Sequence, residues 1–248
     1  MKTTLDVAYG TCDAQRLDIY APDGKTRAVF LYFHGGGMKK GDKSGASAYA
    51  SYLVERGIAL ISANYRMYPE AKYPDFVVDA ASCAAFAKKY ASDELGCDKL
   101  YIGGISAGGY LSMMLCFDPG YLAAAGMDNS QIAGYLHGAG QPTAHFNVLA
   151  EKGIDPRRVI VDETSPLYHV GTAESYPPMR FIVSDNDMQN RYEQTMLILS
   201  TLKHFEYTNF DHIVMHGKHC SYTKEYDENG NNVFAMMIND FINHVESN

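Results

Sequence analysis

One serine of this chain, Ser106, has the sequence surroundings of a catalytic nucleophile. It stands in Gly104-Ile-Ser-Ala-Gly108, between a short apolar run at 100–102 and helix-forming residues at 111–115. This arrangement predicts a strand, a sharp turn and a helix, with the serine strained and its Oγ exposed above the edge of a sheet. Glycines two before and two after the serine let the strand and the helix pass closely without Cβ clashes. The predicted chemistry is attack of a hydroxyl on an acyl carbon.

A serine hydroxyl attacks well only when a base takes its proton and an acid orients that base. The tetrapeptide 184–187, Ser-Asp-Asn-Asp, follows one expected strand and precedes an expected helix. It offers Asp185 and Asp187 as the acid, and either carboxylate has helix capping as its alternative role. These residues by themselves leave the choice between the two open.

The candidates for the base stand in 216–219, His-Gly-Lys-His, after the last expected strand. We favour His219 over His216 because His219 lies beyond the strand, in the loop that must reach the serine. Serine, acid and base then follow one another along the chain in the order found in α/β-hydrolases.

Such a site also needs hydrogen-bond donors for the oxyanion. The apolar run 28–33 predicts a central strand, and His34-Gly-Gly-Gly37 follows it directly. Glycines at the carboxyl end of a strand form either a flexible turn or a loop whose bare N–H groups point into a cavity. We interpret His34 as the residue that fixes this loop through hydrogen bonds, and keep it as a candidate for the substrate pocket.

Apolar runs and helical spacings alternate along the whole chain. Strands are expected at 17–20, 28–33, 58–63, 100–102, 131–136, 179–183 and 213–215, and helices at 46–56, 75–90, 191–205 and 233–245, besides the helix after Ser106. Strands that alternate with helices predict a mainly parallel sheet with helices on both faces. Ligands bind at the carboxyl ends of the strands in such sheets, where His34, Ser106 and 184–187 fall.

The stretch 138–178 is irregular, with glycines, prolines and scattered aromatic residues. A segment of that length with weak periodicity is typical of a lid or insertion over a site. Since there is no internal repeat or interdomain linker, we expect residues 1–248 to form a single domain in which 138–178 is the lid. His137 and Phe146, near the start of this stretch, are candidates for lining the pocket.

The bulk composition argues against several classes of function. The net charge of −8, without a basic stripe, argues against a nucleic acid as partner. The nine histidines show no metal-ligand spacing, so neither a metal nor another cofactor is indicated. The five cysteines have no C-x-x-C spacing and cannot all pair, which fits free thiols in a reducing compartment. No apolar window is long enough to span a membrane, and no signal-peptide sequence opens the chain, so we expect a cytoplasmic protein. The sequence leaves the oligomeric state open, and a homodimer is one possibility.

Several separated motifs together resemble the hormone-sensitive-lipase-like and carboxylesterase branch of the α/β-hydrolases, which includes small bacterial acetyl and feruloyl esterases. The motifs are Leu17-Asp-Ile-Tyr-Ala-Pro22, His34-Gly-Gly-Gly37, Asn64-Tyr-Arg-Met-Tyr-Pro-Glu70, Gly104-Ile-Ser-Ala-Gly108, Ser165-Pro-Leu167 and Gly217-Lys-His219. They span nearly the whole chain in the family's order, a combination far more specific than any one motif. The resemblance implies the α/β-hydrolase fold and a serine hydrolase.

Carried over by position, the resemblance gives roles to six residues of this chain. They are Ser106 as nucleophile, His219 as general base, Asp187 as acid, and Gly36, Gly37 and the amide of Ala107 as the oxyanion hole. The acid turn departs from the family pattern, because it begins with Ser184 in place of glycine and carries a second acid. Asp185 therefore stays a rival of Asp187. The base also departs from the pattern, because Cys220-Ser221 follows it.

The resemblance thus implies a serine carboxylesterase that acts on small acyl esters through an acyl-enzyme on Ser106. No long helical segment precedes Leu17, so we expect 138–178 to frame the acyl pocket. This favours short or flat acyl groups, acetyl or hydroxycinnamoyl, on carbohydrate-derived substrates among others. The candidate pocket residues are His34, Met38, His137 and Phe146.

Two alternative functions are kept. One is an arylformamidase-like amide hydrolase, whose glycine motif is usually followed by a bulky aromatic residue where this chain has Met38. The other is a non-catalytic hydrolase homologue that binds a small ligand, which the intact serine, acid and histidine set disfavours.

Overall fold

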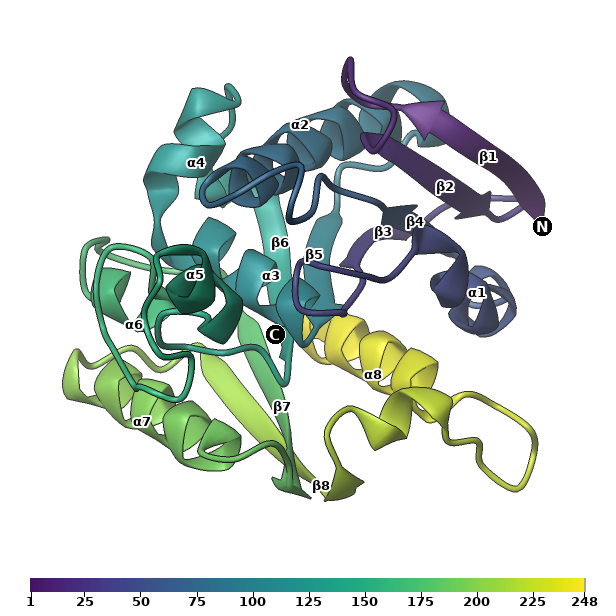
Figure 1. Ribbon diagram of the computed structural model, residues 1–248. Helices are drawn as coiled ribbons and strands as arrows, with labels where there is room; N and C mark the ends of the chain where they lie inside the picture. Colours follow the sequence, from purple (N-terminus) through teal and green to yellow (C-terminus); the bar gives the residue numbers. More distant parts are fainter. Residues whose placement is uncertain (248) are drawn as a thin grey trace.

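The computed structural model describes residues 1–247 and is built on one eight-stranded sheet (Figure 1). The strand order is β1-β2-β4-β3-β5-β6-β7-β8. Two pairs, β1 with β2 and β2 with β4, are antiparallel, and every other neighbouring pair is parallel. The strands are β1 (Lys2–Ala8), β2 (Arg16–Ala21), β3 (Ala28–Phe33), β4 (Ile58–Ala63), β5 (Leu100–Ile105), β6 (Ile132–Gly138), β7 (Met179–Asn186) and β8 (Phe210–Lys218).

Helices cover both faces of this sheet, as Figure 1 shows. The residues of α1 and α8 pack into one apolar core, and those of α2, α3 and α7 pack into the other. The helices are α1 (Ser47–Val54), α2 (Asp75–Leu95), α3 (Ala107–Phe117), α4 (Pro119–Ala124), α5 (Phe146–Glu151), α6 (Pro166–His169), α7 (Arg191–His204) and α8 (Val233–Ser247), with the short 3₁₀ helices η1 (Lys43–Ala46), η2 (Asn129–Gln131) and η3 (Ser221–Lys224). The prediction of a mainly parallel sheet between two helical layers is confirmed.

The central strands are fully buried because helices lie over both of their faces. β3 and β4 are buried at every residue, as expected for continuous apolar runs in a parallel sheet. β1 was not expected from the sequence: its residues are mostly exposed and carry no apolar alternation, so pairing with β2 determines it. The helix expected at 75–90 continues to Leu95 and ends at Gly96, which takes the left-handed conformation typical of a helix end.

The irregular stretch 138–178 contains the short helices α5 and α6. Most of its first part, 138–149, is buried against the rest of the molecule, whereas most of 150–163 is exposed. Within residues 1–247, no helix combines the length and the apolar character needed to cross a bilayer. All five cysteines are free thiols.

Candidate active site

Ser106 forms the sharp turn between β5 and α3. Its backbone has φ 53° and ψ −113°, a region that a residue with a Cβ rarely adopts. The two flanking glycines explain how the turn closes: a Cβ on Gly104 would stand 2.5 Å from the carbonyl oxygen of Phe33, and one on Gly108 would stand 1.9 Å from the same oxygen. The Ser106 amide donates to Gly138 O at 2.7 Å, which ties the turn to the end of β6.

Three side chains from three different strand ends meet at this turn. His219 Nε2 lies 2.9 Å from Ser106 Oγ, and His219 Nδ1 lies 2.5 Å from Asp187 Oδ1. His219 follows β8, and the residue after it, Cys220, has φ 55°, so the chain turns sharply there. Nδ1 donates to the carboxylate, which leaves Nε2 free to accept the serine proton. The arrangement can therefore turn a serine hydroxyl into a nucleophile.

Asp187 is held as a carboxylate although its side chain is fully buried. Burial alone would raise its pKa, but the hydrogen bond from His219 and the charge of that ring act in the opposite direction. The backbone amides of Met188 and Ser184 also donate to it, at 2.7 and 3.3 Å. Together these contacts lower the pKa of Asp187, so the carboxylate is ionised and orients His219.

In the glycine loop after β3, two carbonyl groups accept hydrogen bonds, and these bonds fix the direction of two backbone N–H groups. His34 Nδ1 donates to Gly35 O at 2.7 Å, and the amides of Lys39 and Lys40 donate to Gly36 O at 3.2 Å each. In a trans peptide the N–H points opposite to the C=O. The N–H groups of Gly36 and Gly37 are therefore directed away from these donors. The third amide expected at the oxyanion, that of Ala107, opens α3, where the first amides have no partner within the helix.

His34 is anchored from behind by the loop after β4. Its ring stacks on Tyr65 with centroids 4.6 Å apart, and Tyr65 Oη donates to His34 O at 2.9 Å. The next residue, Arg66, pairs with buried Asp79 of α2 at 2.7 Å. Burial lowers the pKa of His34, which keeps the ring neutral. This histidine positions the glycine loop through hydrogen bonds.

Ser106 and His219 line a cavity of about 1040 Å³. Of the four residues predicted for the substrate pocket, His34 and Phe146 line this cavity, and Met38 and His137 do not. Met38 is fully buried in a core cluster, and its backbone φ is positive, at 57°. His137 lies in β6, in the interior of the sheet, with Nδ1 2.9 Å from Ser112 Oγ, and burial lowers its pKa to about 3. Both predictions are wrong, because these residues pack into the core.

Asn147 is a neighbour of the site that the sequence analysis missed. Its Nδ2 donates to Gly37 O, so it braces the glycine loop from the side of α5. Of residues 138–178, Phe146 and Asn147 are the two that line the cavity; the other walls come from the glycine loop, α1 and η3. The expectation that 138–178 frames the pocket thus holds for one corner only. Asn147 had no motif of its own, although it directly follows Phe146.

Cys220 also lines the cavity, with Sγ 3.7 Å from His219 Nε2. Burial, aided by the charge of Asp187, raises the pKa of this thiol to about 12. A thiol that stays protonated at neutral pH is a poor nucleophile. The group that His219 can activate is therefore the hydroxyl of Ser106.

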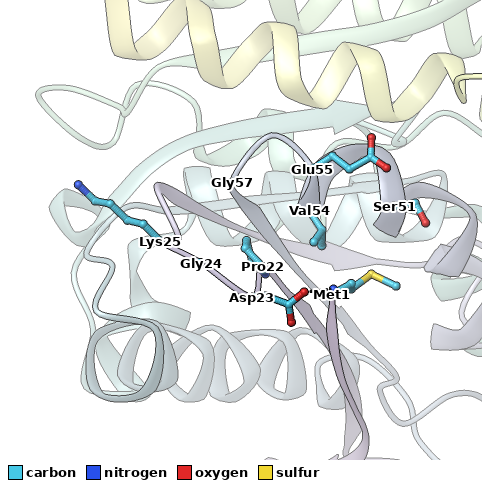
Figure 2. A pocket seen from close by; sticks show the side chains of 9 residues that line it. All are labelled: Met1, Pro22, Asp23, Gly24, Lys25, Ser51, Val54, Glu55 and Gly57. Carbon is cyan, nitrogen blue, oxygen red and sulfur yellow. Dashed lines mark hydrogen bonds and ion pairs between the residues drawn. The ribbon is translucent and has the colours of Figure 1, made fainter.

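A separate hollow of about 430 Å³, shown in Figure 2, lies where β3 and β4 begin. Pro22, Asp23 and Gly24 lie on one side of it, and Val54 and Gly57 lie on the other. Ligands of such sheets bind at the carboxyl ends of the strands, which is the opposite edge. Among the described residues, no histidine lines this hollow, so the candidate site is the cavity at Ser106.

Two curated relatives match parts of the chain. The carboxylic ester hydrolase LipN of Mycobacterium tuberculosis is 35% identical over 101 residues, which cover 39% of this chain and 27% of LipN. The kynurenine formamidase of Danio rerio is 29% identical over 116 residues, which cover 46% of this chain and 39% of that enzyme. The chain thus spans less than half of the length of either relative.

Among solved structures, a truncated carbohydrate esterase from gut microbiota superposes with a TM-score of 0.80. Its sequence is 20% identical, and the match covers 100% of this chain and 97% of that structure. This likeness supports the fold alone. The family model BD-FAE matches residues 17–147, which is more than half of the chain and includes the glycine loop and the serine turn. The chain therefore belongs to the BD-FAE family of α/β-hydrolases.

Proposed function

We propose that this protein is a serine carboxylesterase that hydrolyses small acyl esters through an acyl-enzyme on Ser106. The observation that carries the proposal is the continuous hydrogen-bonded chain from Asp187 through His219 to Ser106 at the mouth of a large cavity. The amides of Gly36, Gly37 and Ala107 are proposed as the donors that stabilise the oxyanion.

In the proposed reaction, Ser106 Oγ attacks the ester carbonyl while His219 Nε2 takes its proton. The carbonyl oxygen becomes an oxyanion that the loop and helix amides stabilise. Collapse of this intermediate expels the alcohol, which takes the proton from the imidazolium. A water molecule then repeats the sequence: His219 takes its proton, the water oxygen attacks the acyl carbon, and Ser106 recovers its proton as the acid leaves.

The walls of the cavity favour small or flat acyl groups. Tyr32 and Tyr49 meet edge to face with ring centroids 5.5 Å apart, so aromatic rings close one side. Residues of the glycine loop and of η3 line other parts of the cavity. We expect acetyl and hydroxycinnamoyl esters to be hydrolysed with higher kcat/KM than octanoyl esters. A preference for octanoate over acetate would contradict this part of the proposal.

The test of the reaction is hydrolysis of p-nitrophenyl acetate by the wild type and by Ser106→Ala. Removal of the nucleophile is expected to lower kcat by about 10⁴–10⁶-fold. A fluorophosphonate probe should label the wild type stoichiometrically and leave the variant unlabelled. Turnover by Ser106→Ala near the wild-type rate would disprove the assignment, and an unlabelled wild type would favour a non-catalytic ligand-binding homologue.

The formamidase relative supports a second candidate, hydrolysis of an aryl formamide by the same residues. The chemistry differs only in the leaving group, which is an amine that must be protonated by His219. Comparison of kcat/KM for N-formylkynurenine and for phenyl acetate separates the two. We expect the ester to be preferred, and a formamide preference of more than about tenfold would reverse the order of the candidates.

A further inference from the structure

A second, smaller cavity lies beside the one that contains Ser106. It has a volume of about 270 Å³, and two side chains, Phe146 and Met188, line both cavities. Met188 directly follows Asp187, and the Phe146 ring lies 3.7 Å from where a Cβ on Gly37 would stand. The second cavity therefore begins on the far side of two side chains that border the reaction centre. A substrate that extends past them would reach it.

Arg191, at the start of α7, brings a buried positive charge to this second cavity. Its side chain is 3% exposed and donates to Ala139 O and, at 3.2 Å, to Gln141 Oε1. Within residues 1–247, its guanidinium makes no ion pair, and its hydrogen bonds go to a carbonyl oxygen and an amide oxygen. Asp187 acts on it electrostatically but is held by His219. A buried cation without an ion-pair partner favours a ligand that supplies a negative charge.

A second cation, Arg158, lines the same cavity and is also unpaired. Its neighbour Arg157 is bound to Asp155, with Nε 2.9 Å from Oδ1 and 3.1 Å from Oδ2. In the part of the chain that the structure describes, the Arg158 side chain has neither an ion pair nor a hydrogen bond. Both arginines line the cavity, but Arg157 is paired with Asp155 whereas Arg158 is available to a ligand.

Gln194, one turn along α7 from Arg191, adds an unmet acceptor. The residue is 8% exposed and lines the second cavity. Its Oε1 is buried and has no hydrogen-bond partner among residues 1–247. A buried acceptor left unpaired costs free energy, which a donor on a bound ligand would recover. A ligand hydroxyl is such a donor.

We propose that the second cavity binds the alcohol part of the substrate when that part carries a carboxylate and hydroxyls, as an acylated uronic acid sugar does. The carboxylate would contact Arg158 and Arg191, and a ring hydroxyl would donate to Gln194 Oε1. Arginine recognises carboxylates through paired N–H groups, which suits this role. The inference rests on the proposed esterase function, since it names the substrate class of the same site.

The first test compares two substrates that differ only at one carbon: methyl mono-O-acetyl-galacturonoside and methyl mono-O-acetyl-galactopyranoside, as the 2-O and 3-O isomers. We expect the wild type to have an about tenfold higher kcat/KM for the acid of at least one isomer, chiefly through a lower KM. Arg158→Gln should bring this acid-to-neutral ratio close to one. Arg157 also lines the cavity but is bound to Asp155, so the matched control, Arg157→Gln, should lower the ratio by no more than about twofold.

Two results of this comparison would overturn the proposal. One is an acid-to-neutral ratio near one in the wild type for both isomers. The other is an equal drop in both arginine variants, which would show a diffuse field instead of a site. Because each variant is judged by a ratio of two substrates, partial loss of folded enzyme does not affect the outcome.

A second variant tests the hydroxyl contact. Gln194→Leu removes the acceptor while keeping much of the side-chain volume, so KM should rise about three- to tenfold for both sugar esters and the acid-to-neutral ratio should persist. Unchanged KM values would remove Gln194 from the proposal.

Direct binding separates failure of the second cavity from failure of the esterase function. Calorimetry of Ser106→Ala with methyl galacturonoside and with methyl galactopyranoside needs no turnover. Tighter binding of the acid, lost in Ser106→Ala/Arg158→Gln, would support the cavity even if p-nitrophenyl acetate is not hydrolysed. Equal binding of the two sugars would overturn the cavity even if that ester is hydrolysed.

Discussion

Two histidine–aspartate pairs bridge the same two strand ends in this molecule, and they differ in their surroundings. His219 Nδ1 lies 2.5 Å from Asp187, and His216 Nδ1 lies 2.8 Å from Asp185. In the first pair the histidine side chain is 22% exposed and the aspartate is fully buried. In the second pair the values are 98% and 44%. The chemistry of the two pairs is the same, so their function must be set by position.

The two pairs differ in position in two ways: whether the histidine faces a serine, and whether it is exposed to solvent. Nε2 of His219 faces Ser106 Oγ, whereas the ring of His216 stands in solvent at the end of β8. The other carboxylate oxygen of Asp185 accepts a hydrogen bond from the amide of Gly217 at 2.9 Å, which links β7 to β8. Charges in solvent are screened, and a base without a nucleophile has nothing to activate. We therefore propose that the inner pair, His219 and Asp187, is the catalytic one and that the outer pair, His216 and Asp185, braces the two strand ends.

The largest expected effect separates the two histidines. His219→Ala should lower kcat/KM for p-nitrophenyl acetate by about 10⁴–10⁶-fold, because the serine then has no base. His216→Ala should stay within about threefold of the wild type, since it removes only an exposed contact. Equal losses in the two variants, measured on protein with native circular dichroism, would break the comparison.

A smaller difference is expected between the two acids. Asp187→Asn should reduce kcat by about 10³–10⁴-fold, because the amide no longer holds His219 in the tautomer that accepts the serine proton. Asp185→Asn keeps an acceptor for the Gly217 amide, so its kcat should change by less than about threefold. If Asp185→Asn were the more damaging change, the role of acid would pass to the outer pair.

The fold could be predicted from the sequence more completely than the residues that line the pocket. Strands β3 and β4 were predicted residue for residue, because continuous apolar runs between turn residues leave little choice. β1 was missed because its residues face solvent and only its partner strand defines it. Local periodicity reports burial, and an edge strand has little of it.

The site divides in the same way. Ser106, Asp187 and His219 lie in motifs at strand ends, and the topology of a parallel sheet brings strand ends together. Met38 and His137 also follow or end strands, yet their side chains enter the core. Which way such a residue points depends on its packing against distant parts of the chain, as with Met38, which packs into a core cluster. The second cavity has no motif that marks it in the sequence, since Arg191 and Gln194 lie on α7 whereas Arg158 comes from the segment after α5.

The smallest expected effect is on the stability of the fold. The contribution of the outer pair, His216 and Asp185, to that stability should depend on pH. The hydrogen bond and charge of Asp185 raise the pKa of His216 above 6.5, and the Gly217 amide followed by His216 lowers that of Asp185 below 3.8. When folding raises the pKa of a histidine, the stabilisation is complete at pH values below the pKa in the unfolded protein. It disappears as the pH rises through the pKa in the folded protein. A lowered aspartate pKa stabilises above its unfolded value, and this disappears as pH falls through the folded one.

The contact between His216 and Asp185 should therefore stabilise the protein most near pH 5 and scarcely at pH 9, whereas the contact of Asp185 with the Gly217 amide persists at pH 9. We expect His216→Ala to lower Tm slightly at pH 5 and to match the wild type at pH 9, with the difference at pH 5 reduced in 0.5 M NaCl. Calorimetric scans of the two proteins at both pH values measure this directly. A deficit that is larger at pH 9 than at pH 5 would mean that His216 acts through packing, and the two pairs would then differ in kind as well as in position.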